Sequence, residues 1–231
     1  MTPHLLNRCL NFIQPAQDCV LCGAASATHL ICHDCHAELP RPATPCPICA
    51  APGSGEVCGQ CLQHPPHYTR SVAALDYTFP VDKLIQAYKY HHQLALARLF
   101  GTLLSQAVQQ QARPDLLLPM PLHPTRLRER GFNQAHEIAK RIGKTLNLPA
   151  TPGLARRVVN TASQATLDWD ARKKNMKGAF ACDAALTGQH IALVDDVMTS
   201  GATLNELSKT LKQAGAGEIS VWVVARAVAH H

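Results

Sequence analysis

Apolar and polar residues follow two different patterns along this chain of 231 residues. Residues 1–67 contain few large apolar side chains and many cysteines. From residue 68 onward, short continuous apolar segments alternate with stretches in which apolar residues recur every three or four positions. The first kind of segment is typical of buried strands and the second of amphipathic helices. We therefore expect two domains, at 1–67 and 68–231, joined near Pro65-Pro66.

The larger region is expected to form an α/β domain with a mostly parallel sheet, because strands and helices alternate in it. Strands are predicted at 71–79, 115–122, 191–197 and 218–228. Helices are predicted at 81–110, as one or two helices, and at 134–146 and 203–215. In such sheets ligands bind at the carboxyl ends of the strands.

Composition excludes a disordered chain, because 46% of the residues are apolar and only 16% are charged. The formal net charge of +6 is unevenly distributed: residues 1–67 hold two basic and four acidic side chains, and the rest holds the whole positive excess. A basic balance suggests a nucleic-acid partner. The chain has no predicted signal peptide or membrane-spanning segment, so we expect a cytoplasmic protein without membrane insertion.

The cysteines of the first region form four CxxC pairs in a row. These are Cys19/Cys22, Cys32/Cys35, Cys46/Cys49 and Cys58/Cys61. Each CxxC turn presents two thiolates to a tetrahedral metal, so eight cysteines predict two structural zinc sites with no open coordination position. Redox pairs, disulfides and iron–sulfur clusters are weaker interpretations. Sequential pairing is favoured because it closes shorter loops, and an interleaved cross-brace is the alternative.

Two zinc ions bound by eight thiolates would change the meaning of the net charge. Such sites carry four negative charges in total, which lowers the formal charge of the chain to about +2. The positive charge is concentrated in residues 126–177, with twelve Lys or Arg and four acidic residues. This distribution suits a polyanionic small ligand at least as well as DNA.

The segment 191–206 has the most specific chemistry. Its apolar strand ends in Asp195 and Asp196, and a loop of small and hydroxyl-bearing residues then leads into a helix. That loop contains Thr199, Ser200, Gly201, Ala202 and Thr203. Backbone N–H groups at a helix N-terminus bind phosphate, and paired carboxylates suit the vicinal hydroxyls of a ribose, with magnesium nearby. The sequence therefore predicts a ribose 5-phosphate site.

Residues 191–203 closely resemble the phosphoribosyl pyrophosphate (PRPP) motif of type I phosphoribosyltransferases. With 128–139, 163–180 and the cysteine block, the chain resembles the ComF/GntX family almost throughout. The resemblance implies a type I phosphoribosyltransferase fold behind a double zinc ribbon. It also implies PRPP and magnesium as ligands, and a role with imported single-stranded DNA.

The resemblance also implies further site residues. Pro121 and Leu122, after the first core strand, would contact the pyrophosphate. Residues 125–131 would form a mobile loop in which Arg126, Arg128 and Arg130, at alternate positions of an extended chain, point the same way. Arg126 and Arg130 would neutralise the leaving pyrophosphate, as catalytic residues beside Asp195 and Asp196. Further substrate contacts are expected from Gln164, Arg172 and Asn175.

Two functions remain open from the sequence. The chain is expected to be an enzyme that transfers a phosphoribosyl group to an unknown base or nucleotide. The alternative is a non-catalytic zinc-ribbon adaptor that binds single-stranded DNA or a DNA-import helicase, with the PRPP site as a sensor or relic. The 1–67 region has little positive charge and Phe12 as its one aromatic residue, which argues against direct DNA binding by that region.

Overall fold

A computed structural model describes residues 17–26, 30–159 and 177–227. The chain divides into two compact units, with the boundary between Leu39 and Pro40. The second pair of CxxC turns therefore belongs to the larger unit together with the sheet. The division at residue 67, which rests on composition, stays a prediction.

The smaller unit is held by tight turns around its cysteines. Asp18 and Ala25 form an antiparallel bridge, and the turn between them contains Gly23 with φ of 74°. The short helix α2 (His33–Ala37) begins after Cys32, whose Sγ accepts the backbone N–H of Cys35. Turns of this kind place paired cysteine side chains on one side of the chain.

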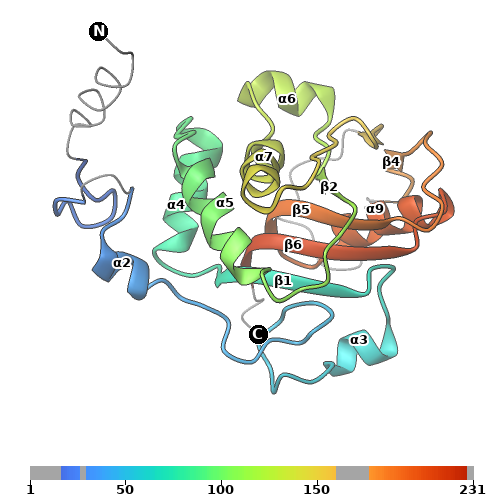
Figure 1. Cartoon of the computed structure of the whole chain (residues 1–231), viewed down its shortest axis with the longest axis horizontal. Helices are drawn as coiled ribbons and strands as arrows, with labels where there is room; N and C mark the ends of the chain where they lie inside the picture. The colour runs from blue at the N-terminus through green and yellow to red at the C-terminus, as the bar shows by residue number, and fades with distance from the viewer. Residues whose placement is uncertain (1–16, 27–29, 160–176, 228–231) are drawn as a thin grey trace, which may run out of the picture. The chain divides into compact units, whose positions relative to one another are not determined.

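The larger unit contains a four-stranded parallel sheet with the order β1–β6–β5–β2 (Figure 1). The strands are β1 (Arg70–Asp76), β2 (Leu116–Pro119), β5 (His190–Met198) and β6 (Glu218–Arg226). Seven of the nine residues of β6 are buried, as expected for a central strand covered on both faces. Strands occur in all four predicted segments, and the predicted fold class is confirmed: a parallel sheet flanked by helices, with two four-cysteine clusters preceding it in the sequence.

Helices form where the apolar periodicity predicts them. The 81–110 stretch forms two helices, α4 (Val81–Tyr90) and α5 (Leu96–Ala107). The predicted helix at 134–146 is α7 (Gln134–Leu146), and that at 203–215 is α9 (Ala202–Gln213). Short helices α3 (Gly59–Gln63) and α6 (Pro124–Arg130) were not predicted.

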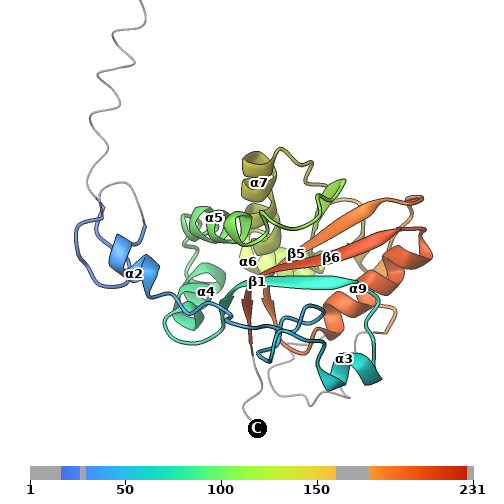
Figure 2. The same ribbon diagram turned by 60° about the horizontal axis from the view of Figure 1, so that its bottom comes forward.

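The two faces of the sheet are covered by different helices. Helices α5 and α7 pack against one face, and Figure 2 shows α9 on the opposite side. Successive strand residues point to opposite faces, so alternate residues of β5 and β6 meet each layer. On the α9 side, Leu204, Leu207 and Leu211 share one buried cluster with Leu193 and Val221. Adjacent residues at the end of β5 therefore face different environments.

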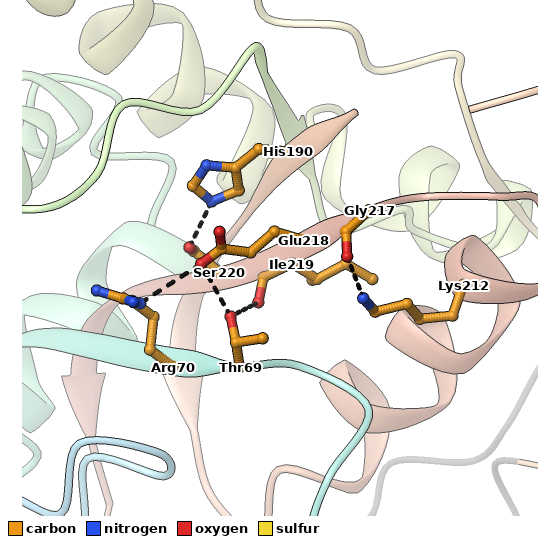
Figure 3. Close-up of polar contacts among 8 residues, drawn as sticks. All are labelled: Thr69, Arg70, His190, Lys212, Gly217, Glu218, Ile219 and Ser220. Atoms are coloured by element: carbon orange, nitrogen blue, oxygen red, sulfur yellow. Dashed lines mark hydrogen bonds and ion pairs between the residues drawn. The ribbon is translucent and has the colours of Figure 1, made fainter. Parts of the chain in front are cut away.

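Polar contacts fasten the strands at their amino ends (Figure 3). The Thr69 hydroxyl donates to Glu218, and Glu218 forms an ion pair of 3.6 Å with Arg70. One ring nitrogen of His190 is 2.7 Å from the hydroxyl of Ser220, which is buried in β6. These contacts lie at the sheet end opposite the paired aspartates.

The remaining described elements are small. Strands β3 (Arg156–Arg157) and β4 (Phe180–Ala181) form a two-stranded antiparallel ladder. Within the described residues, no helix has both the length and the apolar character needed to cross a membrane.

Candidate functional site

The eight paired cysteines form two separate clusters. The first cysteine cluster contains Cys19, Cys22, Cys32 and Cys35, and the second contains Cys46, Cys49, Cys58 and Cys61. Within each cluster the sulfur atoms all lie within 4.8 Å of one another. Pairing along the chain is therefore sequential, as the shorter loops favour. Four thiols at this spacing fit a structural zinc site.

The second cysteine cluster is anchored to the sheet by its backbone. The hydroxyl of Ser71, on β1, donates to the Ile48 carbonyl at 2.6 Å, and the Ser71 N–H donates to Pro47. The guanidinium of Arg226, at the end of β6, donates to the Cys49 carbonyl at 2.8 Å. The Cys46–Cys49 turn is thus part of the α/β unit.

Asp195 and Asp196 lie near the carboxyl end of β5, as predicted. The Asp196 carboxylate is buried and lies 2.9 Å from the ammonium of Lys89, on α4. Burial opposes the charge of Lys89, but the Asp196 and Asp195 carboxylates outweigh it and raise the pKa of Lys89. A cation therefore already compensates one of the two carboxylates.

Asp195 has a different environment from its neighbour. Burial, reinforced by the negative charge of Asp196, raises the pKa of Asp195 to about 7. The opposing contributions come from Lys89, from the Asp196 N–H, which donates to Asp195 Oδ1 at 2.9 Å, and from Arg157. A carboxyl group that titrates near neutral pH is suited to exchange a proton or a cation during ligand binding.

The 199–203 loop forms a tight turn into α9. Gly201 is the N-cap with φ of 75°, and the Ser200 hydroxyl accepts the N–H of Ala202 at 3.4 Å. A Cβ at Gly201 would lie 2.8 Å from Met198 Cε and 3.2 Å from the Tyr68 hydroxyl. The turn therefore requires glycine, and it directs the N-terminus of a twelve-residue helix at the end of β5.

The expected extended loop at 125–131 is a helix, so the prediction that three arginines point the same way was wrong. Pro124 occupies the first turn of α6, and the His123 side chain accepts the Thr125 N–H at its start. Gly131 ends the helix with φ of 73°. These start and stop signals were present in the sequence. In a helix, Arg126 and Arg130 are four residues apart and share a face that excludes Arg128.

A cavity of about 390 Å³ brings the predicted groups together. Its lining includes the predicted residues Leu122, Arg126, Arg130, Asp195, Asp196 and Thr203. Pro121, Thr199, Ser200, Gly201 and Ala202 are not among its lining residues. They lie in the segments that lead directly to Leu122 and Thr203.

The cavity also contains functional groups that the sequence did not indicate. Lys89, Tyr90 and Arg157 line it, and the Arg130 guanidinium lies 5.7 Å from the centre of the Tyr90 ring. Burial lowers the pKa of Arg157, with the Asp195 charge acting in the opposite direction. Lys89 and Tyr90 belong to an amphipathic helix with no recognisable motif, and Arg157 to a two-residue strand, so no sequence signal identified them.

Asn133 connects two parts of the cavity wall. Its side-chain oxygen accepts the His136 N–H and caps α7, and its amide nitrogen donates to the Met120 carbonyl at 3.0 Å. Asn133 is thus the N-cap of α7. The expected contacts of Gln164, Arg172 and Asn175 lie outside the described residues.

Comparison with known proteins identifies relatives that span most of the chain. The chain is 35% identical to competence protein F of Haemophilus influenzae, over 78% of this chain and 85% of that protein. It is 33% identical to the DNA utilization protein YhgH of Salmonella typhimurium, over 85% of this chain and 90% of that protein. Competence protein ComFC of Streptococcus pneumoniae is 24% identical, over 90% of this chain and 99% of that protein. No family model matches the chain.

Solved structures with partial similarity to this chain include the following two. One is the glutamine PRPP amidotransferase of B. subtilis, with a TM-score of 0.40 and 16% identity over 56% of this chain and 26% of that one. Another is the UMP synthase of Leishmania donovani, with a TM-score of 0.37 and 20% identity over 62% and 24%. Similarity at this level extends over only part of the fold.

Proposed function

Because this chain belongs to the ComF family of competence and DNA-utilization proteins, we propose that it binds PRPP and transfers its phosphoribosyl group during the use of imported DNA. The acceptor would be a base or nucleotide. The observation that carries the proposal is the 390 Å³ cavity, whose lining combines the carboxylates of Asp195, Asp196 and Glu129 with four cationic side chains. The four are Lys89, Arg126, Arg130 and Arg157.

The proposed binding mode assigns one part of PRPP to each wall. Asp195 and Asp196 accept hydrogen bonds from the ribose hydroxyls, and the 199–203 loop binds the 5-phosphate through backbone N–H groups and hydroxyls. Arg126 and Arg130 contact the pyrophosphate from α6. The Arg126–Glu129 ion pair of 2.9 Å is exposed, so exchanging Glu129 for a phosphate oxygen costs little.

Magnesium fits this site because carboxylate oxygens are its preferred protein ligands. Bound with PRPP, it would neutralise pyrophosphate charge. In the transfer, the bond from the anomeric carbon to the pyrophosphate oxygen breaks and pyrophosphate leaves with the electron pair. An acceptor nitrogen then bonds to that carbon and loses its proton to solvent. The chain's carboxylates stabilise the developing positive charge on the ribose, and its arginines stabilise the leaving group.

The two halves of the proposed site can be tested separately by calorimetry with the zinc-loaded full chain. Arg130→Gln should weaken binding of magnesium–PRPP and pyrophosphate but not of ribose 5-phosphate, which lacks the pyrophosphate. Asp195→Asn should weaken binding of both sugar phosphates. Arg128→Gln, on the same helix but outside the cavity lining, is the matched control. Equal affinities for all variants would exclude this site.

Turnover distinguishes the enzyme from the adaptor. Pyrophosphate release should depend on one class among a panel of bases and nucleotides, and should be lost in the Asp195→Asn/Asp196→Asn variant. PRPP binding without release on any acceptor would favour the non-catalytic adaptor. The names of the relatives, which refer to competence and DNA utilization, are compatible with that second candidate. For it, single-stranded DNA should bind with an affinity that falls steeply as salt rises.

A further inference from the structure

Arg226 connects the second cysteine cluster to the loop that precedes α9. We propose that Arg226 is a positioning residue through which metal binding at Cys46, Cys49, Cys58 and Cys61 sets the affinity for PRPP. This inference rests on the proposed function, because it concerns the same 199–203 loop. It assigns the second metal a regulatory effect on the site, in addition to its structural one.

The hydrogen bonds of one guanidinium group carry the inference. Arg226 Nη1 donates to the Met198 carbonyl at 3.1 Å and to the Thr199 carbonyl at 2.5 Å. Its Nε donates to the Cys49 carbonyl at 2.8 Å. A planar guanidinium fixes the relative positions of all the acceptors it contacts, so the Cys46–Cys49 turn and the start of the loop are held by one rigid group.

Side-chain packing supports the same connection. Tyr68, Met198 and Leu204 belong to one buried cluster, and Ile48 and Cys49 pack against it. The space around Gly201 is too small for a methyl group, because Met198 and Tyr68 already lie against that residue. A shift of the cysteine turn is therefore transmitted to the loop instead of being absorbed by empty space.

Metal binding fixes the Cys46–Cys49 turn directly. Directly after it, Ala50 has φ of 53°, and the Ala50 N–H donates to the Cys46 carbonyl at 2.8 Å. Four coordinated thiolates hold such a turn closed, and thiols without metal offer one another only weak hydrogen bonds, such as that of 3.7 Å between Cys49 Sγ and Cys58 Sγ. When the metal is lost, the turn is held only by its hydrogen bonds with Ser71 and Arg226. A shift of the Cys49 carbonyl then moves Arg226 or removes one of its acceptors. Either result alters the position of the Thr199 carbonyl.

Thermodynamic linkage makes the proposal testable in both directions. If metal at the second cluster strengthens PRPP binding by some factor, then PRPP must strengthen metal binding there by the same factor. We expect a factor of about 10, within the roughly 5–150-fold range of typical couplings. The first cysteine cluster belongs to the other compact unit and provides the matched comparison.

The experiment uses the full chain with zinc in one cluster at a time. Cys22→Ser removes a ligand of the first cluster, and Cys58→Ser removes one of the second. Zinc release from each variant to a chromogenic chelator is followed with and without magnesium–PRPP. PRPP should slow release from the second cluster, which remains in Cys22→Ser, and leave release from the first unchanged. Equal protection of both clusters, or of neither, would overturn the proposal.

Substitution of Arg226 tests the route of coupling. Arg226→Gln should abolish the protection of the second cluster by PRPP and weaken PRPP binding about tenfold. Arg226→Lys should restore little of the protection or of the affinity, because one ammonium group cannot replace the planar guanidinium. Arg70→Gln, which removes a surface ion pair at the other end of the sheet, should retain full coupling. Coupling that survives in Arg226→Gln would also overturn the proposal.

Hydrogen exchange separates this proposal from the proposed function. If wild-type protein does not bind PRPP, the proposed function fails, and the loop can still be examined without ligand. Removing zinc from the second cluster should then speed amide exchange of the 199–203 loop, and Arg226→Gln should do the same. Unchanged exchange would reject the connection itself. The zinc-loaded Arg226→Gln protein provides this measurement even if Cys58→Ser does not fold.

Discussion

The ammonium group of Lys89, on α4, lies 2.9 Å from a carboxylate oxygen of Asp196, near the end of β5. The side chains are 21% and 9% exposed, so both charges are largely removed from water. Each therefore depends on the other for compensation of its charge. Lys89 also lines the cavity and brings positive charge to it.

Removing one member of this pair should destabilise the protein more than removing both. Lys89→Met leaves a buried carboxylate unpaired and should lower the free energy of unfolding by about 2–4 kcal/mol. The Lys89→Met/Asp196→Asn double variant should recover a large part of this loss. Urea unfolding of the zinc-loaded protein measures both. Lys83→Met, which removes the ion pair of Asp82 with an ammonium-bearing side chain that is 63% exposed, should cost under about 0.5 kcal/mol. A loss there as large as that of Lys89→Met would refute the assignment.

Asp195 should make stability depend on pH. Because its pKa is about 7 in the folded chain and about 4 when unfolded, the folded state binds the extra proton. The resulting stabilisation is complete below pH 4 and is lost as pH rises through 7. Between pH 6 and 8, where the thiolates keep zinc bound, wild type should lose about 1.4 kcal/mol relative to Asp195→Asn.

Parallel denaturant titrations at several pH values give this difference. Asp183→Asn, which changes an exposed carboxylate, should lose as much stability as wild type between pH 6 and 8. If Asp195→Asn also loses as much stability as wild type, then Asp195 does not titrate in this pH range.

Gly201→Ala should combine backbone strain with a steric clash. The substitution places a Cβ at a left-handed φ and 2.8 Å from Met198 Cε, and should cost about 2–4 kcal/mol. Gly188→Ala has almost the same φ of 74° with no atom within 4 Å of the added Cβ, and should cost about 1 kcal/mol. Only Gly201→Ala should weaken PRPP binding. Equal effects of the two substitutions would show that the clash is relieved.

Asn133→Ala should remove the cap of α7 and its link to Met120. The expected loss is about 1–2 kcal/mol in thermal or urea unfolding. Asn133→Asp retains an oxygen that can accept the His136 N–H but loses the donor to the Met120 carbonyl. Asn133→Asp should therefore recover only the part of the free energy of unfolding that comes from the cap. If it is as stable as wild type, the Met120 contact contributes nothing to stability.

The order of strands and helices was predictable because each element carries its own pattern. Buried parallel strands have continuous apolar segments, as in 191–194. In 134–146 the apolar residues recur every three or four positions, which is the period of an amphipathic helix. The family resemblance, together with the alternating arginines, favours an extended loop at 125–131, whereas Pro124 and Gly131, which mark a helix start and end, carry the more reliable information.

The site was predictable only where it is continuous in sequence. Asp195, Asp196 and the following loop form one motif, so their proximity is local. Lys89, Arg157 and Arg226 reach the same region through the folding of distant segments, and an isolated basic residue gives no indication of its partner. The attachment of the second cysteine cluster to the sheet is equally hidden, because composition groups all the cysteines together.

The 40–47 segment covers part of the sheet edge that β1 forms, and so protects it from pairing with another chain. As β1 is an edge strand, any backbone groups without partners could pair with another chain. The Asp76 N–H donates to the Pro40 carbonyl and the Ser71 N–H to the Pro47 carbonyl, so this segment covers part of the edge. Loss of metal from the second cysteine cluster would leave the segment held by these backbone hydrogen bonds without the support of the closed cysteine turn. Chelation is then expected to favour exposure of the strand edge and self-association through it, so zinc at this cluster would also oppose aggregation.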